Sequence, residues 1–194
     1  MTARTPLRLV VGLGNPGGQY AKTRHNAGFW FVDEWAGRLG VKCRYESRWQ
    51  ADVAATEIAG QTIHLVKPMT FMNRSGQPVA SVSRYLKATA AQILVVHDEL
   101  DFDPGVVRLK VGGGHGGHNG LRDIIAVLGN PGFVRLRFGI GRPSDPRPTA
   151  DYVLSKPDTI DEGKILGAAR RVLDDIELLC AGDLVPMMTR LHSA

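Results

Sequence analysis

Polar side chains that can act as acids, bases or hydrogen-bond donors follow four predicted strands of this 194-residue chain. They are Asn15 after residues 7–13, Asn73 a few residues after a strand ending at Val66, Asp98 after residues 93–97, and His118 with Asn119 after residues 106–111. In an open α/β sheet, ligands bind beyond the carboxyl ends of the strands, so we expect these residues to converge at that edge. His25, in the loop before the first predicted helix, can join them.

A histidine beside an aspartate is the smallest combination of a general base and the group that orients it. Asp98 can accept a hydrogen bond from one ring nitrogen of His25, which leaves the other nitrogen free to take a proton from water. Singly, each residue also has a structural explanation, because His, Asp and Asn often cap helices or start turns. His97 should point to the opposite face of its strand from Asp98 and serve the structure. The shared edge therefore favours chemistry with an activated water.

Other kinds of site have less support in the sequence. A metal site built from His25, His115, His118 and Asp98 stays open, although the spacing matches no tight ligand motif. The chain has no GxSxG sequence, and neither of its two cysteines has a neighbouring histidine, so a covalent nucleophile is disfavoured.

Glycine is unusually frequent, at 23 of 194 residues, and much of it falls in residues 12–18 and 112–120. The first cluster has the spacing of a dinucleotide-binding turn, but Pro16, Gly17 and Gly18 prolong the turn, so a nicotinamide site is disfavoured. The second has the glycine spacing of a phosphate loop, but His118 and Asn119 stand where Lys and Ser or Thr are needed. We expect these glycines to serve local backbone geometry and close approach to a ligand.

Predicted strands alternate with predicted helices along the chain, which indicates an α/β fold in a single domain spanning residues 1–194. The strands are predicted at 7–13, 52–58, 62–66, 93–97, 106–111 and 134–140, and the helices at 26–40, 75–86, 119–128, 159–180 and 184–191, with 141–150 as a loop. Asn26 is the predicted cap of the first helix. We expect a twisted, mixed and partly parallel central sheet flanked by helices.

The chain carries a net charge of +5, and the charge is uneven. Residues 1–97 hold 12 Lys and Arg against 5 Asp and Glu, whereas residues 98–194 hold 12 against 14. An excess of Lys and Arg over Asp and Glu is compatible with a polyanionic partner. Two distant cysteines and the lack of a long apolar stretch or secretion signal indicate a protein of the reducing cytoplasm.

Five motifs together resemble those of the bacterial peptidyl-tRNA hydrolase family. They are GLGNPGGQYAKTRHNAG (12–28), KPMTFMNRSG (67–76), HDELD (97–101), GGGHGGHNGLRD (112–123) and FGIGRP (138–143). The resemblance extends from Leu7 to the C-terminal helix, in the same order and spacing. It implies a cytoplasmic, usually monomeric α/β domain, without metal or cofactor. The implied activity is hydrolysis of the ester between a peptide and the 3′-terminal ribose of tRNA, which recycles tRNA from peptidyl-tRNA dropped by ribosomes.

The resemblance also implies roles for individual residues. His25 resembles the catalytic base, Asp98 the residue that holds it in its basic form, and Asn15 the group that senses the blocked amino end. The implied substrate-binding positions are Tyr20, Phe71, Asn73 and Asn119, with Met72 and His118 nearby, and Lys110 and Arg142 among the candidates for phosphate contacts. The two glycine clusters would make the backbone thin around the tRNA 3′ end. A relative that binds RNA without catalysis is the alternative, and the intact catalytic set argues against it.

Overall fold

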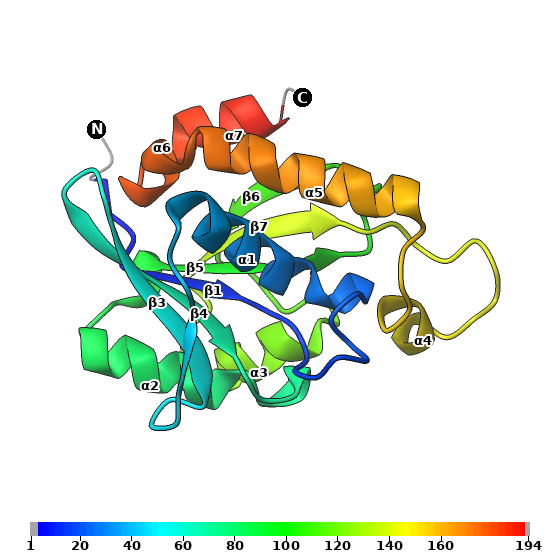
Figure 1. Cartoon of the computed structure of the whole chain (residues 1–194), viewed down its shortest axis with the longest axis horizontal. Helices are drawn as coiled ribbons and strands as arrows, with labels where there is room; N and C mark the ends of the chain where they lie inside the picture. The colour runs from blue at the N-terminus through cyan, green and yellow to red at the C-terminus, as the bar shows by residue number, and fades with distance from the viewer. Residues whose placement is uncertain (1–3, 193–194) are drawn as a thin grey trace.

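A computed structural model describes residues 4–192, which form one α/β domain around a seven-stranded mixed sheet (Figure 1). The strand order is β2-β3-β4-β1-β5-β7-β6. The strands are β1 (Leu9–Gly12), β2 (Arg44–Glu46), β3 (Ala51–Ile58), β4 (Gln61–Pro68), β5 (Ile93–Glu99), β6 (Val107–Val111) and β7 (Val134–Gly139). The predicted fold class is confirmed.

The central strand β1 pairs in parallel with β4 on one side and β5 on the other, and β5 pairs in parallel with β7. The chain therefore leaves β1 in one direction to reach β4 and crosses back to reach β5. Such a change of direction opens a crevice beyond the carboxyl ends of the parallel strands. The predicted hairpin is also confirmed, since β3 and β4 pair antiparallel through Ala59 and Gly60, which both have positive φ angles of 49° and 77°.

Helices cover both faces of the sheet (Figure 1). On one face lie α1 (Ala27–Leu39), α5 (Thr159–Asp174), α6 (Ile176–Cys180) and α7 (Leu184–His192), and on the other α2 (Gly76–Leu86) and α3 (Asn119–Leu128). Strand residues alternate between two buried clusters: Val10, Leu94 and Val96 pack with α1 and α5, whereas Leu9 and Val11 pack with α2 and α3. This alternation of side chains is the ordinary geometry of a strand buried on both faces.

Two glycines bring α1 unusually close to the sheet. A Cβ atom on Gly12 would lie 2.2 Å from the carbonyl oxygen of Gly28, and one on Gly28 would lie 2.3 Å from the carbonyl oxygen of Val96. Gly14 is equally constrained, because its Cβ would lie 2.6 Å from the ring of Phe29. The prediction that Gly12 and Gly14 thin the backbone for a ligand is therefore wrong, since the space they leave is filled by α1. Their effect is to hold the start of α1 against the ends of β1 and β5.

Two predicted elements differ in the structure, and one strand was not predicted. The helix predicted over 159–180 is two helices, because the chain turns at Asp175. At the end of the second helix, the carbonyl oxygen of Cys180 accepts a hydrogen bond of 2.8 Å from the backbone N–H of Leu7. The predicted loop 141–150 ends in a short helix, α4 (Thr149–Val153), and β2 is an additional short edge strand. Within residues 4–192, no helix has both the length and the apolar character needed to cross a membrane.

Candidate active site

His25 and Asp98 meet at the crevice beyond β5. His25 belongs to a short 3-10 turn, η1 (Arg24–Asn26), directly before α1, and its Nδ1 atom lies 2.9 and 3.0 Å from the two carboxylate oxygens of Asp98. Both side chains are buried. Burial alone lowers the pKa of His25, but the charge and the hydrogen bond of Asp98 outweigh it, so the pKa is raised overall. Within the described residues no group bonds to Nε2 of His25, which lines a cavity.

The carboxylate of Asp98 also accepts a hydrogen bond from a second histidine, His118. Nε2 of His118 lies 3.0 Å from Oδ1 of Asp98. Nδ1 of His118 accepts hydrogen bonds from the backbone amides of Gly120 and Leu121 at the start of α3, at 3.2 and 3.3 Å. Nδ1 therefore carries no proton, and Nε2 is the nitrogen that donates to Asp98. Burial favours the neutral acid, but the two histidines outweigh it and hold the pKa of Asp98 well below its usual range, so this carboxyl group stays ionised.

Asn15 is held in place from two directions. The side-chain amide of Asn26 accepts a hydrogen bond from the backbone N–H of Asn15 and donates one to its carbonyl oxygen, both at 2.9 Å. The side-chain oxygen of Asn15 accepts from the backbone N–H of Met72 at 2.8 Å. Asn26 stands at the N-terminal boundary of α1 as predicted, but its side chain does not cap that helix. Its polar atoms instead fix the backbone of Asn15. The side-chain nitrogen of Asn15, Nδ2, has no hydrogen-bond partner within residues 4–192.

His97 was predicted to face away from Asp98, but it lines the same cavity as Asp98 and packs against His118. Its Nδ1 donates a 2.7 Å hydrogen bond to the carbonyl oxygen of Asp98, and its ring centroid lies 5.0 Å from that of His118. Complete burial lowers the pKa of His97 to about 3, so the ring is neutral. An uncharged imidazole ring therefore packs against His118.

The expected convergence at one sheet edge is correct for Asn15, Asn73 and Asp98 but rests on a wrong strand direction for His118 and Asn119. Strand β6 runs antiparallel to β7, and Val111, at its end, pairs with Val134, at the start of β7. The glycine run 112–117 carries the chain back across the sheet to the site. Four of its glycines have positive φ angles of 56° to 98°, which other residues rarely adopt.

A cavity of about 540 Å³ lies in front of the His25–Asp98 pair. Its lining includes the four cationic side chains Lys110, Arg135, Arg137 and Arg142, together with Asn119, His118 and the glycine run. Lys110 is exposed, and Arg142 forms an exposed ion pair with Asp101 at 2.5 Å. The sequence did not single out Arg135 and Arg137, although their alternation along one strand places both on one face of β7. Arg135 donates to the carbonyl oxygens of Gly113 and Gly114 and so holds the glycine run.

The remaining predicted binding residues surround the site. Tyr20 and Phe71 make an edge-to-face contact with ring centroids 6.3 Å apart. Asn73, in the short turn η2 (Met72–Arg74), and Asn119, at the start of α3, are both exposed. Met72 is buried, and a Cβ atom on Gly120 would lie 2.6 Å from its sulfur, so this methionine packs on the start of α3.

Three of the four residues considered as metal ligands do come together. The ligand atoms of His25, Asp98 and His118 lie within 4.8 Å of one another, whereas Nδ1 of His115 accepts a backbone hydrogen bond from Gly117. Distances of 2.9 to 3.0 Å join the first three as hydrogen bonds. Because His118 already uses Nδ1 for the backbone and presents a proton from Nε2, a metal would have to displace that proton. The arrangement fits a hydrogen-bonded triad.

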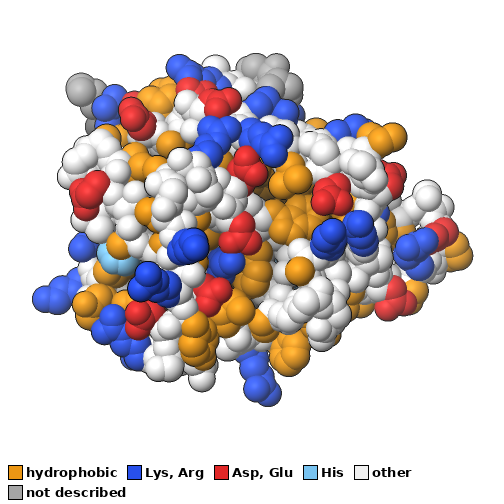
Figure 2. All heavy atoms as spheres, viewed as in Figure 1, with side chains coloured by type: hydrophobic (Ala, Val, Ile, Leu, Met, Phe, Trp, Pro, Cys, Tyr) orange, Lys and Arg blue, Asp and Glu red, His pale blue; other side chains and the backbone are white. Residues whose placement is uncertain are grey.

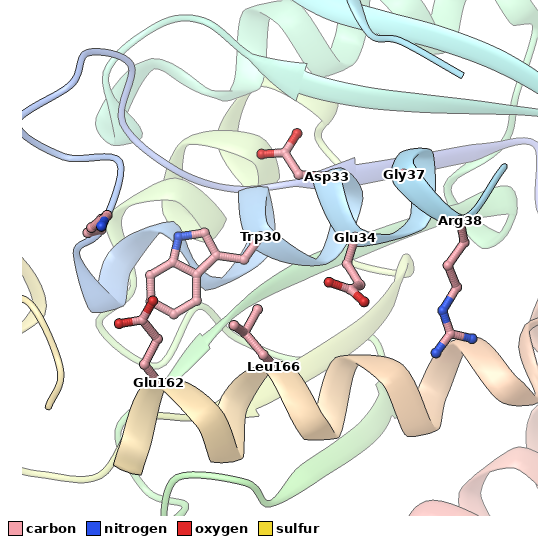
Figure 3. A pocket seen from close by; sticks show the side chains of 8 residues that line it. Trp30, Asp33, Glu34, Gly37, Arg38, Glu162 and Leu166 are labelled. Atoms are coloured by element: carbon pink, nitrogen blue, oxygen red, sulfur yellow. The ribbon is translucent and has the colours of Figure 1, made fainter. Parts of the chain in front are cut away.

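Another cavity, of about 650 Å³, lies away from this site, between α1 and α5 (Figure 3). Figure 3 shows Trp30, Glu34 and Arg38 of α1 facing Glu162 and Leu166 of α5. Glu34 forms an ion pair with Arg170 at 2.9 Å, and Arg38 forms one with Asp174 at 2.8 Å. On this face of the molecule, basic and acidic side chains are interspersed (Figure 2). Its lining residues include no histidine, and Glu34 and Arg38 are already engaged in ion pairs.

Comparison with known proteins agrees with this geometry. The family model described as peptidyl-tRNA hydrolase matches residues 9–194. The chain is 54% identical to the peptidyl-tRNA hydrolase of Methylococcus capsulatus over 96% of its own length and 99% of the relative's, and 49% identical to that of Alkalilimnicola ehrlichii over 97% and 96%. The crystal structure of peptidyl-tRNA hydrolase from Acinetobacter baumannii matches with a TM-score of 0.92 and 42% identity, covering 98% of this chain and 97% of that one. The chain therefore belongs to the peptidyl-tRNA hydrolase family.

Proposed function

We propose that this protein hydrolyses the ester bond between the peptide and the 3′-terminal ribose of peptidyl-tRNA, with a water activated by His25 and Asp98. The observation that carries the proposal is the buried hydrogen-bonded pair at the cavity wall, where Nε2 of His25 has no hydrogen-bond partner among residues 4–192. Asp98 fixes the ring and keeps the proton on Nδ1, so Nε2 is the nitrogen that accepts a proton. His118 orients Asp98 from the other side.

The reaction runs in two proton-balanced steps. Nε2 of His25 takes a proton from water as the water oxygen attacks the ester carbonyl, and the ionised Asp98 stabilises the imidazolium. The tetrahedral intermediate then collapses, the bond to the ribose oxygen breaks, and His25 returns the proton to that oxygen. The products are tRNA with a 3′-terminal hydroxyl and the peptide carboxylic acid, which releases the second proton of the water to solvent and becomes a carboxylate. This route uses no metal, because the ester is already activated and the hydrogen-bonded triad supplies the base.

Asn15 is assigned to the acyl side of the substrate. Its side-chain oxygen is occupied by the N–H of Met72, so its amide nitrogen is the group available to the substrate. A fixed donor at that place can bind a peptide carbonyl oxygen, which a blocked amino end provides and a free aminoacyl ester does not. The exposed amides of Asn73 and Asn119 can add further hydrogen bonds to the peptide or the ribose. A preorganised donor of this kind also stabilises the developing oxyanion.

The tRNA is assigned to the cavity that Lys110, Arg135, Arg137 and Arg142 line. Cationic side chains contact phosphates without reading sequence, which suits an enzyme that must accept many tRNAs. We further propose that the protein acts in the cytoplasm as a monomer on peptidyl-tRNA that ribosomes have released, which returns the tRNA to translation.

The His25→Ala variant tests the proposal. It removes the base and one of the two histidine partners of Asp98, so we expect a folded protein of somewhat reduced stability and normal tRNA affinity, with turnover of N-acetyl-aminoacyl-tRNA reduced about 10²-fold to 10⁴-fold. Near-normal turnover would overturn the assignment of His25. A wild-type protein that binds tRNA but hydrolyses no peptidyl-tRNA would instead support the alternative of an RNA-binding relative without catalysis.

A further inference from the structure

Arg24 directly precedes His25 in the turn η1 and reaches the chain that follows α4. Its Nη1 atom lies 2.7 Å from the hydroxyl oxygen of Ser155, and 3.0 and 3.2 Å from the carbonyl oxygens of Lys156 and Ser155. The backbone N–H of Arg24 also donates to the carbonyl oxygen of Ser155, at 3.1 Å. All of these acceptors are neutral oxygens just beyond a helix end, where cationic side chains are favourable. Backbone and side chain of Arg24 therefore bind the same segment.

Tyr152 extends this connection from α4 to the sheet. The guanidinium carbon of Arg24 lies 4.2 Å from the centre of the Tyr152 ring, a distance at which a planar cation stacks on an aromatic face. The hydroxyl of Tyr152 donates a 2.7 Å hydrogen bond to the carbonyl oxygen of Ile140, directly after β7. The carbonyl oxygen of Tyr152 accepts one from the Ser155 hydroxyl, also at 2.7 Å. Contacts therefore run unbroken from η1 through α4 to the end of β7.

The elements joined in this way surround the catalytic pair. Strand β7 pairs in parallel with β5, where Asp98 lies opposite Phe138. His25 and Asp98 line the same cavity as one side of α4, which contributes Thr149, Ala150 and Val153. Arg24 is not among the residues that line this cavity. It therefore connects the turn that carries the base to the sheet that carries the acid by a route separate from their own hydrogen bond.

We propose that Arg24 is a positioning residue for the hydrolysis, which fixes the turn η1 relative to Asp98 and to the cavity wall that α4 forms. The inference rests on the proposed function, because it requires His25 to act as the base. Asp98 orients the imidazole ring, and Asn26 holds the same turn against Asn15. Arg24 adds the third attachment of the turn. A displacement of a reacting group by about 1 Å is enough to lower a rate about 10²-fold.

The Arg24→Ala variant tests this role. We expect a folded protein whose kcat on N-acetyl-aminoacyl-tRNA is lower by about tenfold to 10²-fold, with KM and the affinity for deacylated tRNA unchanged. The kcat is calculated per molecule able to bind deacylated tRNA, so that unfolded protein does not count as a loss of rate. Arg24→Lys keeps the charge but has no planar group to lie over Tyr152, so it should also stay slower than the wild type.

A double-mutant cycle with Tyr152→Leu tests the route through α4. Arg24→Ala and Tyr152→Leu break the same connection, so the double variant should be about as slow as the slower single variant. Effects on kcat that multiply would mean that the two residues act independently, and would overturn the proposal.

Arg171→Ala provides the matched control. Arg171 is also an arginine that donates to a backbone carbonyl, that of Gly105 at 2.7 Å, but it is exposed and does not line the cavity. This variant should keep the wild-type kcat. A wild-type kcat in Arg24→Ala or Arg24→Lys overturns the proposal, and so does a reduced salt dependence of tRNA binding in Arg24→Ala, which would assign Arg24 to a phosphate. Hydrolysis by the wild-type protein, measured in parallel, reports on the proposed function separately.

Discussion

Nδ1 of His25 lies midway between the two carboxylate oxygens of Asp98, at 2.9 and 3.0 Å, although 73 positions separate the two residues in the chain. Two features bring them together. Asp98 lies near the end of β5, and Gly12 and Gly28 let the start of α1 press against the ends of β1 and β5. The fold thus places a base that precedes a helix directly over an acid that ends a strand.

The Asp98→Asn variant should lose most of the activity without losing the shape of the site. Nδ1 of His25 lies within 3.0 Å of both Asp98 oxygens, whereas Nε2 of His118 contacts only Oδ1, so the NH₂ group of the new amide faces His25 in either orientation. Nδ1 then becomes the acceptor and the proton moves to Nε2, which can no longer act as a base. By analogy with the same change in hydrolases with a His–Asp pair, we expect kcat to fall about 10⁴-fold. Steady-state kinetics with N-acetyl-aminoacyl-tRNA would measure this.

A stability measurement on the same variant separates chemistry from folding. Urea unfolding should show a folded Asp98→Asn protein of reduced stability, since two buried hydrogen bonds to a charge are weakened. An active Asp98→Asn protein would contradict the role of the carboxylate in setting the His25 tautomer.

The pH dependence of kcat/KM should have a single acid limb governed by His25. Burial lowers the pKa of His25, but Asp98 raises it further, so the folded value lies above the ordinary value of about 6.5. Only the neutral ring can accept a proton, so kcat/KM rises as pH rises through this raised pKa and then levels off. Asp98 remains ionised throughout this range, because its pKa is held well below the usual value. A pH profile measured below substrate saturation reports this midpoint.

Removing the charge of Asp98 should shift the acid limb of the pH profile of kcat/KM. In the residual activity of Asp98→Asn, the midpoint should shift to lower pH, because burial still disfavours the imidazolium and no anion opposes it. A midpoint that stays where it was in the wild type would mean that another group titrates in the profile.

Much of the secondary structure could be predicted from local patterns. The helix at 119–128 and the hairpin of β3 and β4 were predicted because apolar periodicity and turn residues are local signals. The direction of β6 was not, because whether a strand runs parallel or antiparallel depends on the partner it meets, here β7. The break at Asp175 was missed because apolar spacing continues across it into α6.

The site shows the same division. His25 and Asp98 could be expected to pair because a base needs an orienting acid and both were predicted beside a common sheet edge. Asn26 was predicted only as a helix cap, since its pairing with the backbone of Asn15 is a contact between turns that no local pattern reveals. Arg135 was missed for a similar reason, because its partners are backbone carbonyls of the glycine run.

Asn26→Ala should reduce both stability and kcat. The substitution leaves the buried N–H and carbonyl of Asn15 without partners, each of which costs about 1–3 kcal/mol in the free energy of unfolding. Asn15 then moves relative to His25, so kcat should fall more than KM rises. Asn130→Ala is the control, because the Asn130 side chain also accepts a backbone hydrogen bond, from Gly132 at 2.8 Å, but is exposed and remote from the site. A destabilised Asn26→Ala protein with unchanged kcat would restrict Asn26 to a structural role.

Lys110→Ala should weaken tRNA binding through charge alone. If Lys110 contacts one phosphate, its removal lowers the slope of log affinity against log salt concentration by about one unit. Arg142→Ala should change the slope less, because Arg142 already pairs with Asp101 and the phosphate has to compete with that carboxylate. Filter binding of deacylated tRNA to each variant between about 50 and 200 mM salt measures the slopes. Lys42→Ala serves as the control, since Lys42 is exposed but lines a pocket away from the site, and should leave the slope unchanged. An unchanged slope for Lys110→Ala would remove Lys110 from the phosphate contacts.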